Sequence, residues 1–167
     1  MRRTRSIVAL LLLAAASLAS AADQPDIFQR LKALQGEWVA VDETGRPTDQ
    51  VVSVFRVTSG GHAIREVMFP GTEHEMVNMY YRDGDTVQMT HYCAAGNQPR
   101  MLLLPGAQPN VVRLQFIDIT NLASPADEHM HEGFFTWVNN DHLKTEWRAF
   151  RNGRYAESTR FDLERRR

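Results

Sequence analysis

The sequence predicts an all-β fold, an antiparallel meander of about ten strands closed as a barrel and preceded by one short helix. Two observations lead to this prediction. Apolar and polar residues alternate through many short segments, as expected of strands that bury one face. Turn-forming residues separate these segments at intervals of about ten residues, the spacing of successive hairpins. The chain of 167 residues fits a single domain, and closing the sheet leaves it without exposed edges.

One helix is predicted over Pro25–Gln35, because Ile27, Leu31 and Leu34 recur at helical spacing. Gly36 follows and is a typical helix end. The segments predicted as strands are, in chain order, Glu37–Asp42, Val51–Ser59, His62–Phe69, Glu75–Arg82, Thr86–Cys93, Arg100–Leu104, Val111–Asp118, Met130–Val138, His142–Phe150 and Arg154–Leu163.

The N-terminus has the pattern of a secretory signal peptide. Three arginines precede the apolar run Ile7–Ala16, and small residues at 19–22 form a cleavage site. The apolar run is too short for a comfortable membrane span, and no later segment approaches one. We therefore expect a signal peptide over residues 1–22, a single barrel domain over residues 23–167, and export to a periplasm or the extracellular space.

The charge balance argues against nucleic acid as a partner. The chain carries 19 Lys and Arg against 20 Asp and Glu, and cleavage of the signal peptide removes three arginines and no acid. The C-terminal arginines, residues 165–167, are expected to fray. Cys93 is the only cysteine, so the domain has no internal disulfide and depends on packing. The oligomeric state stays open.

The hairpin that turns at Asp83 allows a test of register. A three-residue loop pairs Met79 with Met89 and gathers apolar side chains on one face, whereas a two-residue loop mixes apolar with polar partners. The three-residue loop is therefore predicted. In that register Tyr81 and His91 face the interior.

The hairpin that follows Val138 is expected to pair Val138 with His142. This register places Glu132 beside Arg148 on a solvated face, and His131 falls on the opposite, apolar face. The predicted interior residues of this hairpin also include Gly133, Phe135, Trp137, Leu143, Thr145 and Trp147.

The last hairpin gives no consistent register. A two-residue turn at Asn152 and Gly153 would place Arg160 on the face of Trp147, but Phe161 requires the opposite arrangement. The side on which Arg160 lies is left open.

Several motifs resemble those of a known family. Gly36-Glu37-Trp38 after a helix is similar to the Gly-x-Trp with which the calycins, the lipocalins and fatty-acid-binding proteins, begin their barrels. Three later segments add to the likeness, and residues 27–164 resemble an exported bacterial family of unknown function associated with lipocalin-like and nitrobindin-like barrels. These segments are Thr90–Cys93, Gly96–Arg100, and His129–His131 after Asp118–Asn121.

The resemblance implies a lipocalin-like barrel and no particular activity. Nitrobindin-like relatives bind haem through a histidine near the end of the chain. The last predicted strand here has no histidine, and the strand before it has only His142, at its beginning. Haem is therefore not the expected cofactor, and there is no Cys-x-x-Cys-His motif for covalent attachment.

Histidines suggest a metal site as one interpretation. His129 and His131 are two residues apart on a strand, so both can reach one metal ion, and His91 could add a third ligand and leave an open position. A divalent metal is the cofactor that this arrangement would hold. The alternative is that His129 is exposed in a loop and His131 is a hydrogen-bonded barrel residue.

Two further groups could carry function. His91 and Cys93 share one strand face, which would help a thiolate to form, although a buried thiol can equally be a small apolar side chain. Methionine and aromatic residues could line a ligand cavity or fill a solid core. The predicted ligand-binding set is Tyr81, Met79, Met89, His91, Cys93, His131, Phe135, Trp137, Thr145 and Trp147.

The favoured function is an exported barrel that binds a small, largely apolar molecule, with no nucleic acid and no membrane span. A binding protein is favoured over an enzyme. One alternative is a metal-dependent or histidine-based enzyme that uses His91, His129 and His131. The other is a solid barrel that acts as an interaction module, for which an exposed apolar patch would be the sign.

Overall fold

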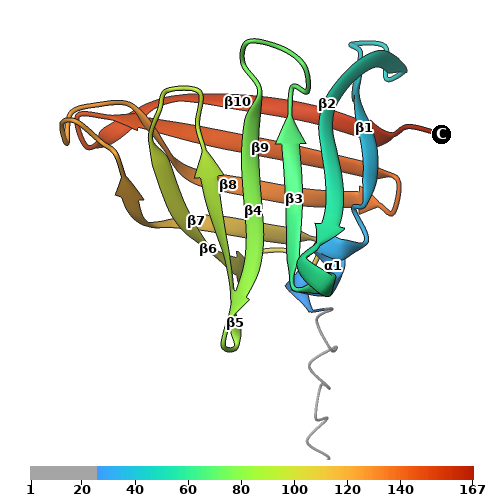
Figure 1. Ribbon diagram of the computed structural model, residues 1–167. Helices are drawn as coiled ribbons and strands as arrows, with labels where there is room; N and C mark the ends of the chain where they lie inside the picture. The colour runs from blue at the N-terminus through green and yellow to red at the C-terminus, as the bar shows by residue number, and fades with distance from the viewer. Residues whose placement is uncertain (1–25) are drawn as a thin grey trace, which may run out of the picture.

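The computed structural model describes residues 26–167, which form a closed antiparallel barrel of ten strands with one short α-helix (Figure 1). Each strand pairs with its neighbours in the chain, and β1 pairs with β10 to complete the ring. The predicted all-β meander is thus confirmed. The predicted signal peptide lies outside the described residues. The elements are α1 (Ile27–Lys32), β1 (Gly36–Val41), β2 (Pro47–Thr58), a 3-10 turn (Ser59–Gly61), β3 (Ala63–Met68), β4 (Met76–Asp83), β5 (Thr86–Tyr92), β6 (Gln98–Pro105), β7 (Val111–Thr120), β8 (His129–Asn139), β9 (His142–Arg151) and β10 (Arg154–Arg165).

All ten predicted strands are present, with ends that differ by a few residues, and the helix is shorter than predicted. Asp26 caps α1, because its side chain accepts a hydrogen bond from the backbone nitrogen of Phe28 at 2.9 Å. Phe28 and Leu31 are buried in the core. Figure 1 shows α1 at the end of the barrel where β4 turns into β5, and the ion pair between Asp26 and Arg82 lies there.

Arg165 joins the helix end to the last strand, so the expectation that it frays was wrong. Its guanidinium donates hydrogen bonds to the carbonyl oxygens of Ala33 at 2.8 Å and Gln35 at 2.6 Å. The same group lies 4.6 Å from the ring centre of the fully buried Trp38 and pairs with Asp141 at 2.8 Å. One side chain therefore closes the seam between the first and last strands.

The predicted loop between β4 and β5 was wrong by one residue. Asp83 pairs with Thr86, which leaves a two-residue turn, and Asn78 pairs with His91. Asn78 and Tyr80 are fully buried, so they and not their neighbours face the interior. The prediction failed because it assumed an apolar inner face, whereas this face carries a polar network.

The register of the β8–β9 hairpin was predicted correctly over its central pairs. Gly133 lies opposite Trp147, and Phe135 lies opposite Thr145. The turn end differs, because a bulge there pairs His142 with Asn139 instead of Val138. A second bulge, between Met130 and Glu132, displaces the start of β8.

A β-bulge resolves the conflict in the last hairpin. The pairing begins with Arg151 opposite Arg154, as a two-residue turn requires, and shifts by one between Tyr155 and Glu157. Beyond the bulge, Thr159 lies opposite Trp147 and Arg160 lies opposite Glu146. Phe161 and Leu163 can then face the core.

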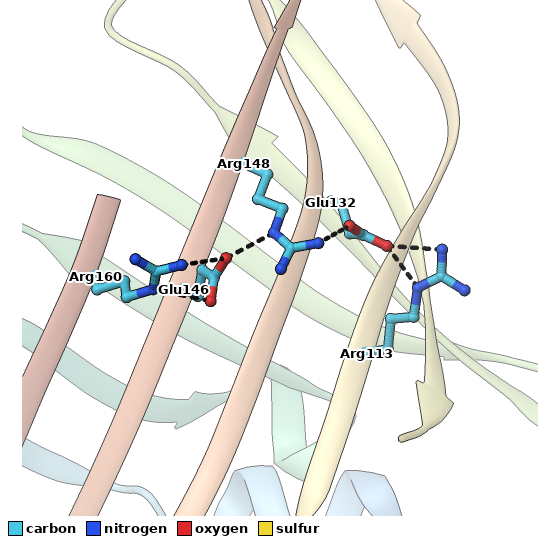
Figure 2. A network of polar contacts seen from close by, with 5 residues as sticks. All are labelled: Arg113, Glu132, Glu146, Arg148 and Arg160. Carbon is cyan, nitrogen blue, oxygen red and sulfur yellow. Dashed lines mark hydrogen bonds and ion pairs between the residues drawn. The ribbon is translucent and has the colours of Figure 1, made fainter. Parts of the chain in front are cut away.

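Arg160 therefore belongs to the outer wall. Figure 2 shows it at one end of a chain of alternating charges that crosses β7, β8, β9 and β10. Arg160 contacts Glu146 at 3.0 Å, and Arg148 bridges Glu146 at 2.6 Å and Glu132 at 2.8 Å. Arg113 completes the chain through Glu132 at 2.7 Å. These pairs tie four neighbouring strands together on their solvated face.

Candidate functional site

An apolar pocket of about 110 Å³ lies at the end of the barrel opposite α1. Met68 ends β3 and Met76 begins β4, so the pocket sits beside the turn between these strands, whereas α1 lies at the other end of β4. Strands β5, β8, β9 and β10 complete its wall. The lining residues are Met68, Phe69, Met76, His91, Met130, Trp147, Thr159 and Phe161.

Two polar atoms at this pocket have no protein partner. His91 and Trp147 are 2% and 4% exposed, and their rings stack with centres 5.9 Å apart. Within residues 26–167, neither Nε2 of His91 nor Nε1 of Trp147 makes a hydrogen bond. The other such atom, Oδ1 of Asn97, lies in the turn after β5. Buried polar atoms almost always have partners, so two at one apolar pocket indicate a binding site.

A buried carboxylate supports the site from behind. Glu66 in β3 is 1% exposed and accepts hydrogen bonds from Ser53 at 2.7 Å, Asn78 at 2.7 Å and the Tyr80 hydroxyl at 2.5 Å. Burial raises the pKa of Glu66, and the three hydrogen bonds oppose that rise. Burial next to Glu66 raises the pKa of Tyr80 well above its usual value, so the phenol keeps its proton and remains a donor.

This network sets the tautomer of His91. The Nδ2 amide of Asn78 donates to Glu66, so its Oδ1 faces Nδ1 of His91 at 2.6 Å. An amide oxygen can only accept, so Nδ1 carries the hydrogen. Burial lowers the pKa of His91 to about 4, and the ring is neutral at pH 7. Nε2 therefore carries no hydrogen, and this atom is itself buried within a residue that lines the pocket.

The site can accept a hydrogen bond through His91 and donate one through Trp147. Packing holds both rings, and the hydrogen bond with Asn78 also holds His91, so both rings are oriented before a ligand binds. The unprotonated imidazole nitrogen is also a metal ligand. The pocket is thus prepared for a neutral polar group surrounded by apolar surface.

The structure brings only part of the predicted ligand-binding set to this pocket. His91 and Trp147 line it. Met89, Phe135 and Thr145 are buried but do not contribute to its wall. These three residues belong to the interior beyond the pocket.

Four other predicted residues lie elsewhere. Met79 and Tyr81 alternate with the buried Tyr80 and so face outward, which corrects the prediction that they point inward. Trp137 is partly buried beneath the guanidinium of Arg30 from α1, 4.1 Å from its ring centre. Cys93 is half-buried beyond the end of β5, in the turn that its backbone nitrogen closes onto Asn97.

The three predicted metal ligands, His91, His129 and His131, do not form one site. His129 and His131 do meet, with 3.1 Å between Nε2 and Nδ1, and His131 stacks between Phe116 and Phe150 with ring centres 4.3 Å and 4.1 Å away. Burial and the neighbouring His129 lower the pKa of His131. In residues 26–167, no three His, Cys, Asp or Glu side chains come close enough to hold a metal ion, so His91 is separate from this pair.

The supporting network was missed in the sequence. Its signal was Glu66, which alternates with Ile64 and Met68 and so shares their buried face. A carboxylate on an apolar strand face requires hydrogen-bond donors inside the barrel. Asn78 and Tyr80, also two residues apart, are those donors.

Comparisons with protein-family models and with curated proteins identified no related protein. No protein-family model matches the sequence, and no curated protein matches it significantly. Among the residues described, no helix has the length and apolar character needed to cross a membrane. The closed antiparallel barrel is the architecture that the calycin resemblance implied.

Proposed function

We propose that this protein binds a small, neutral, largely apolar molecule that carries one hydroxyl or similar polar group. The observation that carries the proposal is the pair of buried atoms at the apolar pocket, His91 Nε2 and Trp147 Nε1, with no partner in residues 26–167. A hydroxyl group can donate to the first and accept from the second. Such a ligand would satisfy both atoms at once.

The size and charge of the pocket restrict the ligand. Its volume of about 110 Å³ is somewhat below the roughly 150 Å³ of an engineered cavity that binds benzene. A single small ring or a short branched chain is therefore of suitable size. The described lining residues include no Lys, Arg, Asp or Glu, and His91 is neutral, so a charged organic ligand would lack a counterion.

Phenol and toluene test this proposal because they differ mainly in a hydroxyl against a methyl group. Binding to the mature domain can be followed by NMR chemical-shift titration. We expect phenol to bind about tenfold more tightly than toluene, since only phenol pairs with both buried atoms. His91→Asn keeps a donor for Asn78 but removes the Nε2 acceptor, and Trp147→Phe removes the N–H. Either variant should reduce the preference for phenol.

Trp137→Phe is the matched control, because Trp137 does not line the pocket. Its phenol affinity should equal that of the wild type. Equal affinities of the wild type for phenol and toluene, or an unchanged phenol affinity in His91→Asn and Trp147→Phe, would contradict the proposal.

We also infer that the protein is exported, on the basis of the N-terminal sequence alone. Basic, apolar and small residues follow one another there in the order of a signal peptide. Expression in a bacterial host, fractionation and N-terminal sequencing provide the test. A mature chain beginning at Ala22 or Asp23 outside the cytoplasm is expected, and an intact chain confined to the cytoplasm would refute the inference.

A further inference from the structure

Methionine sulfur is concentrated at the same pocket. Met68, Met76 and Met130 supply three of its lining residues, and His91 supplies its unprotonated imidazole nitrogen. Met68 and Met76 are direct partners in the ladder between β3 and β4. Cross-strand partners have neighbouring side chains, so these two methionines lie next to each other in the wall of the pocket.

The sulfur of Met68 and the ring of His91 contact the same amide. Asn78 Nδ2 lies 3.4 Å from Met68 Sδ, while Asn78 Oδ1 lies 2.6 Å from His91 Nδ1. Met76 is two residues before Asn78 on the same strand and therefore shares its face. The arrangement of β3, β4 and β5 thus gathers two thioethers and one imidazole around Asn78.

The third methionine comes from the other side of the pocket. Met130 in β8 pairs with Ala149, which is two residues from Trp147 in β9. Trp147 stacks on His91, so the part of β8 and β9 that contains Met130 lies near the imidazole. Phe69 and Phe161, whose ring centres are 5.5 Å apart, complete an apolar surround.

We propose that the pocket is a Cu(I) site whose ligands are His91 Nε2 and the thioether sulfurs of Met68, Met76 and Met130. Thioethers are soft ligands that select Cu(I), and imidazole also suits copper. Calcium and magnesium prefer oxygen ligands, and none of the lining residues described is a carboxylate. Cu(I) carries a single charge, so an apolar site opposes it less than it opposes a divalent ion.

The hydrogen bond from His91 to Asn78 gives the site its orientation. It places the ring hydrogen on Nδ1 and so leaves a lone pair on Nε2 that can bind a metal ion, and Glu66 holds Asn78 in turn. Groups behind a metal-ligating histidine commonly act in this way. The inference goes beyond the proposed function and does not rest on it, but both occupants use His91 Nε2, so copper and a hydroxyl ligand should compete.

Anaerobic titration of the mature, untagged domain with Cu(I), in competition with bicinchoninate, tests the site. We expect one high-affinity Cu(I) per chain. Met68→Leu and Met130→Leu should each weaken binding at least tenfold, because leucine keeps the apolar wall and removes the sulfur. Met89→Leu is the control, since Met89 is buried in the barrel but does not line the pocket, and its affinity should be unchanged.

Phenol titration of the same variants separates the two proposals. Met68→Leu and Met130→Leu should retain phenol while losing Cu(I), whereas His91→Asn should weaken both. A wild type that binds Cu(I) no more tightly than a variant carrying both Met68→Leu and Met130→Leu would overturn the copper site and leave the phenol result intact.

X-ray absorption of the Cu(I)-loaded wild type gives a readout that does not depend on a variant folding. Sulfur neighbours with one nitrogen are expected around the metal. Coordination by nitrogen and oxygen alone would overturn the assignment.

Discussion

At the residue scale, the candidate site depends on a series of hydrogen bonds that runs from Glu66 through Asn78 to His91. In these three residues, every side-chain nitrogen and oxygen has a hydrogen-bond partner within residues 26–167 except Nε2 of His91. The fixed tautomer means that this atom is an acceptor and a ligand atom, not a donor. His91 therefore defines what the pocket can bind.

The buried imidazole makes stability depend on pH. Its pKa falls from 6.5 in the unfolded chain to about 4 in the folded protein. Between these values the unfolded chain takes up the proton and the folded protein does not, so the free energy of unfolding falls as the pH is lowered from 6.5 to 4. With about 1.4 kcal/mol for each pKa unit, the loss is on the order of 3 kcal/mol.

Urea unfolding of the wild type and His91→Asn at several pH values between 7 and 4 measures this effect. Asparagine keeps a donor for Asn78 but does not titrate, so the variant should show a smaller loss of stability over this range. Other titrating groups are common to both proteins and cancel in the comparison. Parallel pH profiles would show that His91 does not cause the dependence.

At the element scale, the outer walls of β7 to β10 are joined by the alternating arginines and glutamates of Figure 2. Glu146 is central, because Arg148 and Arg160 both donate to it. Hydrogen-bonded networks contribute more than isolated surface pairs, and salt screens them.

Glu146→Gln should lower the free energy of unfolding by about 1 kcal/mol at low ionic strength and by less in 1 M salt. Glu73→Gln is the control, because the Glu73 side chain is 88% exposed and contacts only the exposed His74. Its effect should be close to zero. A loss of equal size at both salt concentrations would show that Glu146 acts through packing and not through charge.

At the scale of the whole molecule, the barrel is closed by pairing between its first and last strands. Arg165 strengthens this seam with hydrogen bonds to Ala33, Gln35 and Asn140, an ion pair with Asp141 and a contact over Trp38. The helix end, the first strand and the turn between β8 and β9 are thus connected by one side chain near the C-terminus.

Arg165→Ala should destabilise the protein by about 1–3 kcal/mol, since several hydrogen bonds of a side chain that is 23% exposed and a cation–π contact are lost together. Arg166→Ala is the matched control. Arg166 has a single side-chain ion pair, with Glu37 at 3.1 Å, and 45% of its side chain is exposed, so its loss should cost under about 1 kcal/mol. Chemical denaturation compares the two, and equal effects would refute the role of Arg165.

The sequence by itself determined the class of fold, because period-two alternation and regularly spaced turns identify strands and hairpins wherever one face is apolar. The β8–β9 hairpin obeyed that rule, and its central register followed from Phe135 and Trp147. The β4–β5 hairpin does not follow this rule, because the polar residue Asn78 lies on its buried face.

The sequence predicted His91 and Trp147 as site residues, and the tertiary structure decided which other residues join and support them. Glu66 lies far from His91 in the chain, and the pairing of β3 with β4 and of β4 with β5 brings its carboxylate behind the imidazole. In the last hairpin the sequence shows only that the turn and Phe161 require different registers. The bulge after Tyr155 reconciles them, so that Arg160 lies outside and Thr159 lines the pocket. Alternation predicts which residues share a strand face, but register, bulges and buried hydrogen bonds depend on partners that are distant in sequence.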